Sequence, residues 1–106
     1  MIISVVPREA LGIVWGDVAK LMNRSVETSN GKYHIDDLYH AIVGGQYVLW
    51  VVMDGNEAIA AITTSVISYP GRKAMAMDWI GGRRMREWLP MAVETLSEYS
   101  RKNGCS

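Results

Sequence analysis

The chain has 106 residues and a mass of 11.8 kDa, which is the size of one domain and excludes a two-domain enzyme. Hydrophobic residues make up 49% of it and charged residues 21%, so it has enough apolar matter for a core and is too apolar for intrinsic disorder. Its 11 basic residues balance 11 acidic ones, and the pI of about 6.7 argues against a general nucleic-acid binder.

The N-terminus indicates where the protein is located, and the single cysteine and two histidines bear on disulfides and metal binding. Residues 1–6 begin apolar, without the basic stretch of a signal peptide, and no apolar run approaches the roughly 20 residues that span a bilayer. We therefore expect a cytoplasmic protein that does not associate with membranes. Cys105 is the only cysteine, which excludes an internal disulfide. His34 and His40 lack zinc-site spacing and a cluster of further ligands, so no metal site is expected.

The first apolar segments predict a strand followed by a long helix. Residues 2–6 are β-rich and end at Pro7, which suits the first turn of a helix. Apolar residues then recur at three- and four-residue steps over residues 8–24, which predicts an amphipathic helix. The helix tolerates Gly12 and Gly16, which are weak helix formers, so we expect a bend or close packing at these two positions.

A polar loop and a shorter helix come next. Residues 25–32 are polar and contain the turn pair Asn30-Gly31. Residues 35–43 repeat apolar side chains with helical spacing and carry two aspartates in the first turn, where carboxylates complement the helix dipole. The Gly44-Gly45 pair is expected to end this helix, because glycine adopts the left-handed cap without a clash.

The pattern then changes to that of an antiparallel meander. Residues 47–53 and 58–68 are β-rich and flank a tight turn, and the Pro70-Gly71 turn leads into a further strand over residues 73–80. Simple alternation along this last strand divides its side chains between two faces. Met75, Met77 and Trp79 are expected on one face, and Ala74, Ala76, Asp78 and Ile80 on the other.

The last segment has the strongest helical pattern in the chain. Gly81 and Gly82 break the preceding strand, and apolar residues then repeat with helical spacing. Pro90 leaves two starts open, because proline withholds a hydrogen bond inside a helix. Either a regular helix begins within residues 86–89, or it begins at Arg83 and kinks.

The predicted fold is α/β, of the α+β type. An antiparallel sheet of three to four strands is packed by three helices, in the order β-α-α-β-β-β-α. This order resembles the N-terminal half of the GNAT-superfamily N-acetyltransferase fold. Residues 47–52 (Tyr-Val-Leu-Trp-Val-Val), 68–72 (Ser-Tyr-Pro-Gly-Arg) and 79–85 (Trp-Ile-Gly-Gly-Arg-Arg-Met) are similar to small phage-encoded GNAT-like proteins. The resemblance takes in residues 1–106 as a single domain and about half of a full family domain, without the family's C-terminal strands.

The resemblance implies a cofactor site after the fourth strand. In the family, a glycine-containing loop at this place presents backbone amides, at the start of a helix, to the pyrophosphate of coenzyme A. Gly81, Gly82, Arg83 and Arg84 occupy the corresponding place and keep its small residues and positive charge, without the complete family motif. They are the candidate residues for binding acetyl-CoA or another acyl-CoA. The alternative is that the glycines only make a turn and the arginines are solvated.

The same resemblance implies N-acetyl transfer to an amine. Asp78 lies near the end of the fourth strand, where the family's cleft opens. It is the candidate catalytic residue because it could orient a water or accept the amine proton. A hydrogen-bonded or solvent-facing carboxylate is the alternative for this residue. The rival function for the whole chain is a non-catalytic phage structural, accessory or host-interaction protein that reuses the fold.

The edge of the fourth strand is a candidate interaction surface. If this strand has no neighbour on its outer side, a free edge lies along an apolar and largely uncharged segment. Proteins usually pair or cover such an edge. We therefore expect a homo-oligomer or a protein partner there.

Overall fold

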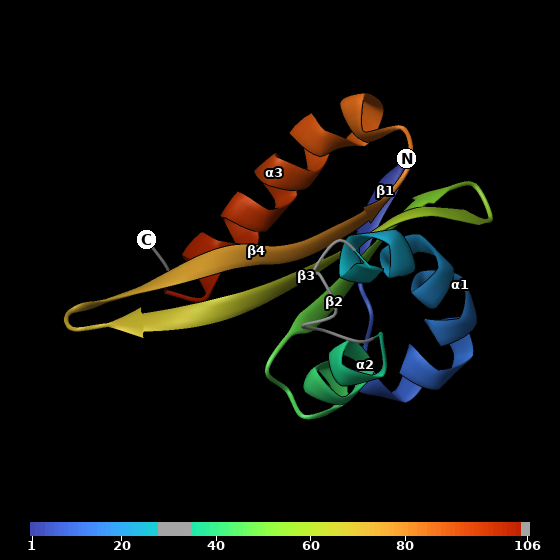
Figure 1. Ribbon diagram of the computed structural model, residues 1–106. Helices are drawn as coiled ribbons and strands as arrows, with labels where there is room; N and C mark the ends of the chain where they lie inside the picture. The colour runs from blue at the N-terminus through green and yellow to red at the C-terminus, as the bar shows by residue number, and fades with distance from the viewer. Residues whose placement is uncertain (28–34, 105–106) are drawn as a thin grey trace.

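The computed structural model describes residues 1–27 and 35–104, and shows an antiparallel sheet with helices on both faces (Figure 1). The strands are adjacent in the order β1 (Ile2–Val5), β2 (Val48–Asp54), β3 (Glu57–Tyr69) and β4 (Arg72–Gly82). The helices are α1 (Arg8–Glu27), α2 (Ile35–Val43) and α3 (Met85–Lys102). The element order confirms the predicted β-α-α-β-β-β-α arrangement, with four strands in the sheet.

Helix α1 differs from the prediction in length and in the role of its glycines. It continues to Glu27, past the predicted end at residue 24. A Cβ added to Gly12 or Gly16 would meet no atom within 4 Å, because both glycines lie on the exposed side of the helix. The expectation of close packing at these positions is therefore wrong. The predicted turn at Asn30-Gly31, together with His34 and Cys105, lies outside the described residues.

The sheet separates two hydrophobic cores. Leu49 and Val51 of β2 pack with α1 and α2 on one face, whereas Trp50 and Val52 pack with α3 on the other. Successive side chains of a strand point to opposite faces, so residues 48–53 of β2 are all apolar because both faces of this stretch are covered. Figure 1 shows α3 on one side of the sheet and the other two helices on the opposite side.

A bulge in β4 overturns the predicted division of its faces. Met77 and Trp79 pair with adjacent residues of β3, so Asp78 between them is an extra residue in the strand. An extra residue reverses the alternation beyond it. Met75 and Met77 pack against the α3 core, but Trp79 packs against the core under α1 and α2, and Ile80 returns to the α3 side. The prediction that Trp79 shares a face with the two methionines is wrong for this reason.

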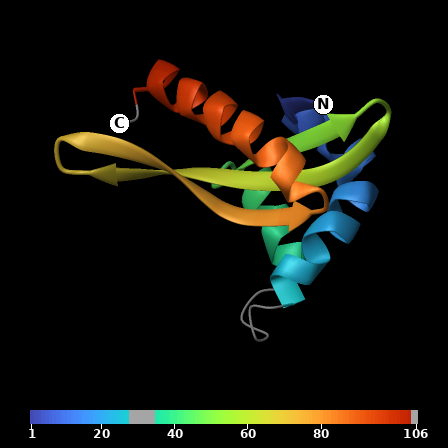
Figure 2. The same ribbon diagram turned by 90° about the horizontal axis from the view of Figure 1, so that it is seen from above.

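The β3–β4 hairpin extends beyond the rest of the sheet. Pairing between β2 and β3 begins at Thr64, so residues 65–69 pair only with residues 72–76 of β4. Figures 1 and 2 both show this segment projecting away from α1 and α2 as an arm. We call residues 65–76 the hairpin arm. It carries three of the large hydrophobic side chains that remain exposed: Val66, Ile67 and Tyr69.

Helix α3 begins between the two predicted positions. It starts at Met85, so Pro90 lies inside the helix and withholds the N–H that would otherwise bond to the carbonyl of Arg86. Trp88 is 0% exposed and packs with Ile59 and other residues of the α3 core. Burial of this indole in the first turns fixes the start of α3 against the end of β4.

Candidate functional site

The turn from β4 into α3 is packed tightly against neighbouring backbone. A Cβ added to Gly81 would lie 2.2 Å from the carbonyl oxygen of Leu21, and one added to Gly82 would lie 2.4 Å from that of Ile59. Gly82 also has a φ of 136°, a conformation that favours glycine. The packing of the protein itself therefore requires both glycines.

Hydrogen bonds fix the two arginines that follow. The backbone N–H of Arg83 donates to the carbonyl of Ile59 at 3.0 Å, and the indole N–H of Trp88 donates to the carbonyl of Arg83 at 2.9 Å. Arg84 caps α3 with left-handed backbone angles of φ 61° and ψ 35°, and its side chain makes no cap hydrogen bond. The first N–H groups of a helix lack partners inside the helix and carry partial positive charge. The backbone of this junction thus favours an anion.

The side chains of the two arginines are engaged with carboxylates. Arg83 Nη2 forms an ion pair with Glu57 Oε1. Arg84 Nη1 lies 2.7 Å from Asp54 Oδ2, and Arg84 Nε lies 2.7 Å from Glu87 Oε2. Asp54 and Glu57 stand at the two ends of the β2–β3 turn, and Glu87 is in the first turn of α3. We call these five side chains the junction cluster, and its carboxylates neutralise the charge that the sequence places here.

The junction cluster is exposed to solvent, which limits what its ion pairs contribute. The side chains of Arg83 and Arg84 are 54% and 38% exposed. The Arg84 guanidinium, by its hydrogen bonds and its charge, holds the pKa of Asp54 and that of Glu87 below their ordinary values. Glu87 and Asp54 in turn raise the pKa of Arg84 through the same hydrogen bonds. Exposed pairs of this kind are screened by water and salt, so another anion can compete for the arginines.

The structure does not bring Asp78 to the arginines. Asp78 is exposed in the bulge of β4, and Gly82 lies four positions further along the strand, roughly 13 Å away at 3.3 Å per step. The backbone N–H of Trp79 beside it donates to Thr63 Oγ1 at 3.1 Å. Asp78 is therefore a solvent-exposed carboxylate, and its catalytic role stays a prediction.

Sequence reasoning missed the acidic half of the junction cluster. Glu87 follows Arg84 by three residues in a predicted helix, a spacing that brings side chains together, so the sequence held that signal. Asp54 lies 30 residues before Arg84, and Glu57 lies 26 residues before Arg83. Only the register of the strands brings these two carboxylates to the junction, and no local pattern indicates it.

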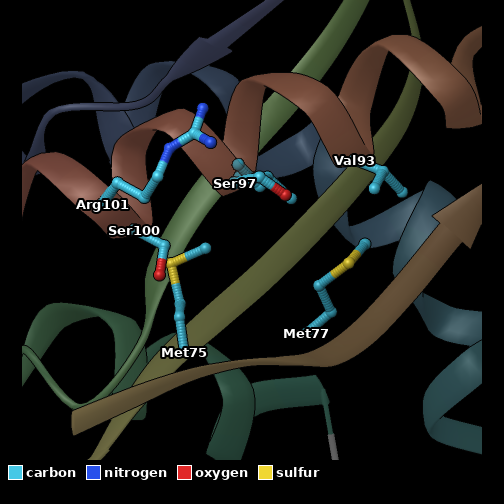
Figure 3. A pocket seen from close by; sticks show the side chains of 7 residues that line it. Met75, Met77, Val93, Ser97, Ser100 and Arg101 are labelled. Atoms are coloured by element: carbon cyan, nitrogen blue, oxygen red, sulfur yellow. The ribbon is translucent and has the colours of Figure 1, made fainter. Parts of the chain in front are cut away.

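A separate groove of about 310 Å³ lies between the other end of β4 and α3 (Figure 3). Met75 and Met77 line it from the strand, and Val93, Ser97 and Arg101 line it from the helix.

Within residues 1–27 and 35–104, no group of three histidine, cysteine or acidic side chains is arranged to hold a metal ion. In the same part of the chain, none of the helices has the length and apolar character needed to cross a membrane.

Comparisons with known proteins identify the fold. No family model and no curated protein matches the chain. Among solved structures, a GNAT family acetyltransferase from Staphylococcus aureus matches with a TM-score of 0.72 and 12% identity, over 99% of this chain and 81% of that one. A tetramutant of the BH1408 protein from Bacillus halodurans matches with a TM-score of 0.67 and 15% identity, over 97% of this chain and 77% of that one.

The chain therefore has a GNAT-like fold, as the order of its elements predicts. At these identities the likeness is one of fold. The match extends over 81% of the Staphylococcus aureus structure. That the chain is a single domain without the family's C-terminal strands stays a prediction. The similarity to phage-encoded proteins stays a prediction.

Proposed function

We propose that the protein binds acetyl-CoA or another acyl-CoA at the junction of β4 and α3. The observation that supports this proposal is the pair Arg83 and Arg84 at the N-terminus of an 18-residue helix, within a GNAT-like fold. Phosphate oxygens accept hydrogen bonds from helix N-terminal amides and, in bidentate fashion, from guanidinium groups. The pyrophosphate of coenzyme A has the charge and the acceptors that this position favours.

The junction cluster sets the condition under which this ligand fits. A pyrophosphate has to replace Asp54, Glu57 and Glu87 as the partner of the two arginines. Because these ion pairs are exposed, exchanging one anion for another at the same guanidinium costs little. The arginines therefore fit the group, provided that they leave their present partners, and their carboxylates act as competitors of the ligand.

N-acetyl transfer to an amine is the activity that we propose with this cofactor. When bound, an acyl-CoA would supply an acyl thioester, whose transfer to a neutral amine releases a thiolate and one proton from the amine. Asp78 is the proposed acceptor of that proton, from its exposed position in the bulge of β4. An Asp78→Asn variant is expected to lose turnover and to keep acyl-CoA affinity, which calorimetry and a thiol-release assay measure separately.

A non-catalytic phage structural, accessory or host-interaction protein that reuses the fold is the second candidate. It is favoured by the junction cluster, in which carboxylates of the chain itself already satisfy both arginines, and by the exposure of Asp78. In this case the cluster serves to tie the β2–β3 turn to α3, and the fold is used without a cofactor.

Titration calorimetry with acetyl-CoA separates the two candidates. We expect binding to the wild type, and weaker binding to a variant that combines Arg83→Ala with Arg84→Ala. A variant that combines Asp54→Asn with Glu57→Gln is expected to bind more tightly, because the competing carboxylates are gone.

Arg101→Ala is the matched control, since it removes an exposed arginine at the opposite end of α3 and should leave acetyl-CoA affinity unchanged. Circular dichroism confirms that each variant is folded. If no binding occurs at millimolar acetyl-CoA, the acyl-CoA function is wrong. If binding occurs but neither double variant changes it, the site lies elsewhere.

A further inference from the structure

We propose that a second copy of this chain pairs with the open edge of β4, antiparallel and centred on Met75. This proposal concerns the hairpin arm and the strand segment beside the groove, and it is independent of acyl-CoA binding at the junction. It rests on the backbone groups at the edge, on the charges along it and on the groove next to it.

The outer edge of β4 presents backbone hydrogen-bonding groups. Within residues 1–27 and 35–104, no strand lies beyond β4. Tyr69 and Arg72 are partners on either side of the two-residue turn. Residues that flank a turn of this length form a hydrogen-bonded pair, and bonded and non-bonded pairs alternate from there. By this alternation, the N–H and C=O groups of Met75 and Met77 point away from β3.

Between Lys73 and the bulge at Asp78, this edge lacks the protection that edge strands usually carry. Residues 74–77 read Ala-Met-Ala-Met, without charge or proline, and lie in a strand of 11 residues. Proteins blunt free edges with charges, prolines, bulges or very short strands. Here the bulge at Asp78 interrupts the strand, so the regular pairing surface is the segment from Arg72 to Met77.

The charges along this segment are complementary to the same segment turned around. Arg72 lies three residues before Met75, and Asp78 lies three residues after it. In an antiparallel pair centred on Met75, Arg72 of each copy lies opposite Asp78 of the other copy. Neither residue forms an ion pair among the described residues, and Arg72 lies over the ring of Tyr69, 5.1 Å from its centroid. Opposite charges facing each other across two strands stabilise their pairing.

The same register agrees with the direction of the backbone groups. Centring on Met75 places the outward-pointing residues of one copy opposite outward-pointing residues of the other, so both sets of backbone groups find partners. A shift by one residue would oppose outward-pointing residues to inward-pointing ones and would separate Arg72 from Asp78. Charge and backbone geometry therefore favour one register.

The groove in Figure 3 accommodates side chains from the second copy. Met75 and Met77 stand on the α3 side of the sheet, and Val93, 48% exposed, faces the groove from the helix. A two-fold axis perpendicular to the sheet keeps the α3 faces of both copies on the same side. Met75 and Met77 of the second copy then lie beside the groove, where flexible thioether side chains adapt to irregular gaps. Each copy supplies both members of the contact, which closes the assembly as a dimer.

Sedimentation equilibrium over a roughly hundredfold range of protein concentration tests the proposal. We expect a reversible monomer–dimer equilibrium for the wild type. Arg72→Asp and Asp78→Arg should each weaken the dimer by roughly tenfold or more, because each creates two contacts between like charges. An equimolar mixture of the two variants should dimerise again, since both contacts in the mixed dimer join opposite charges. Lys20→Glu, an exposed charge reversal on α1, is the control and should leave dimerisation unchanged.

Three results would overturn the proposal: a wild type that stays monomeric throughout, a dimer that neither reversal weakens, or a mixture that associates no better than its components. Should a reversal prevent folding, amide hydrogen exchange of the wild type provides a second test. Exchange at Met75 and Met77 should slow as protein concentration rises, because these N–H groups enter the new pairing. Exchange rates there that do not depend on concentration would also overturn the proposal.

Discussion

The two ends of β4 differ in how completely their interactions are satisfied. At the C-terminal end, Gly81 and Gly82 pack against backbone, Trp88 is buried, and Arg83 and Arg84 are paired with carboxylates. At the N-terminal end, the hairpin arm exposes large apolar side chains and one free edge. The residue types that a ligand site needs are thus largely engaged within the fold at one end of β4. At the other end, a plain apolar strand leaves backbone groups and apolar side chains without partners among the described residues.

Glycine substitutions at the two ends provide the largest expected contrast. Gly81→Ala places a Cβ against the Leu21 carbonyl, and we expect a loss of about 3 kcal/mol or more in the free energy of unfolding. Gly71→Ala in the arm meets no atom within 4 Å and has only the cost of a φ of 84°, about 1–2 kcal/mol. Urea denaturation measures both losses. Equal losses of stability in the two variants would show that the C-terminal end of β4 is not packed more tightly than the hairpin arm.

Trp88→Phe probes the same end through its side-chain packing. The substitution removes the hydrogen bond to the Arg83 carbonyl and part of a fully buried ring, so we expect a loss of about 2 kcal/mol in the free energy of unfolding. Trp15→Phe, at a half-buried position of α1, is the control and should cost less. A smaller loss for Trp88 than for Trp15 would contradict the importance of the indole for the junction.

Much of the fold is predictable from the sequence because its signals are local. Apolar periodicity locates α3, and the Pro70-Gly71 turn locates the end of the β3–β4 hairpin. The faces of β4 are predictable only up to Asp78, because the bulge depends on how β3 and β4 align and no local pattern marks it. Gly12 and Gly16 are misjudged because the sequence does not show which side of α1 faces solvent.

The candidate site is predictable in part. Gly81, Gly82, Arg83 and Arg84 are found by their place between a strand and a helix, where the structure indeed brings them together. The carboxylates that engage the arginines come mainly from the β2–β3 turn. The register of the strands brings these carboxylates to the arginines, and neither composition nor residue spacing predicts that register.

Substitution of the exposed glycines of α1 is expected to stabilise the protein, whereas substitution of Gly81 is expected to destabilise it. Because open space surrounds Gly12 and Gly16, alanine at either position should raise the free energy of unfolding by about 0.5–1 kcal/mol. This gain contrasts with the loss expected at Gly81. Thermal unfolding monitored by circular dichroism measures the change, and a loss at either position would show that a side chain there meets an unseen constraint.

The junction cluster is expected to give the smallest effect, visible as a pH dependence. The folded state lowers the pKa of Asp54 and of Glu87 from ordinary values of 3.8 and 4.5, so their stabilisation is present above these values and is lost as pH falls through the lowered ones. Arg84→Ala removes this dependence. The stability difference between wild type and variant should therefore shrink between about pH 6 and about pH 3, and high salt should shrink it at about pH 6 as well. A difference that stays constant over this range would contradict the ion pairing.

Residue-resolved NMR during an acetyl-CoA titration tests the central claim most directly, because one measurement reports on both ends of β4. We predict saturable shifts of backbone amides at residues 81–87 and at the β2–β3 turn, with residues 72–77 unaffected at constant protein concentration. Shifts that gather along the hairpin arm, or no shifts at millimolar acetyl-CoA, would contradict the assignment of the ligand site to the β4–α3 junction.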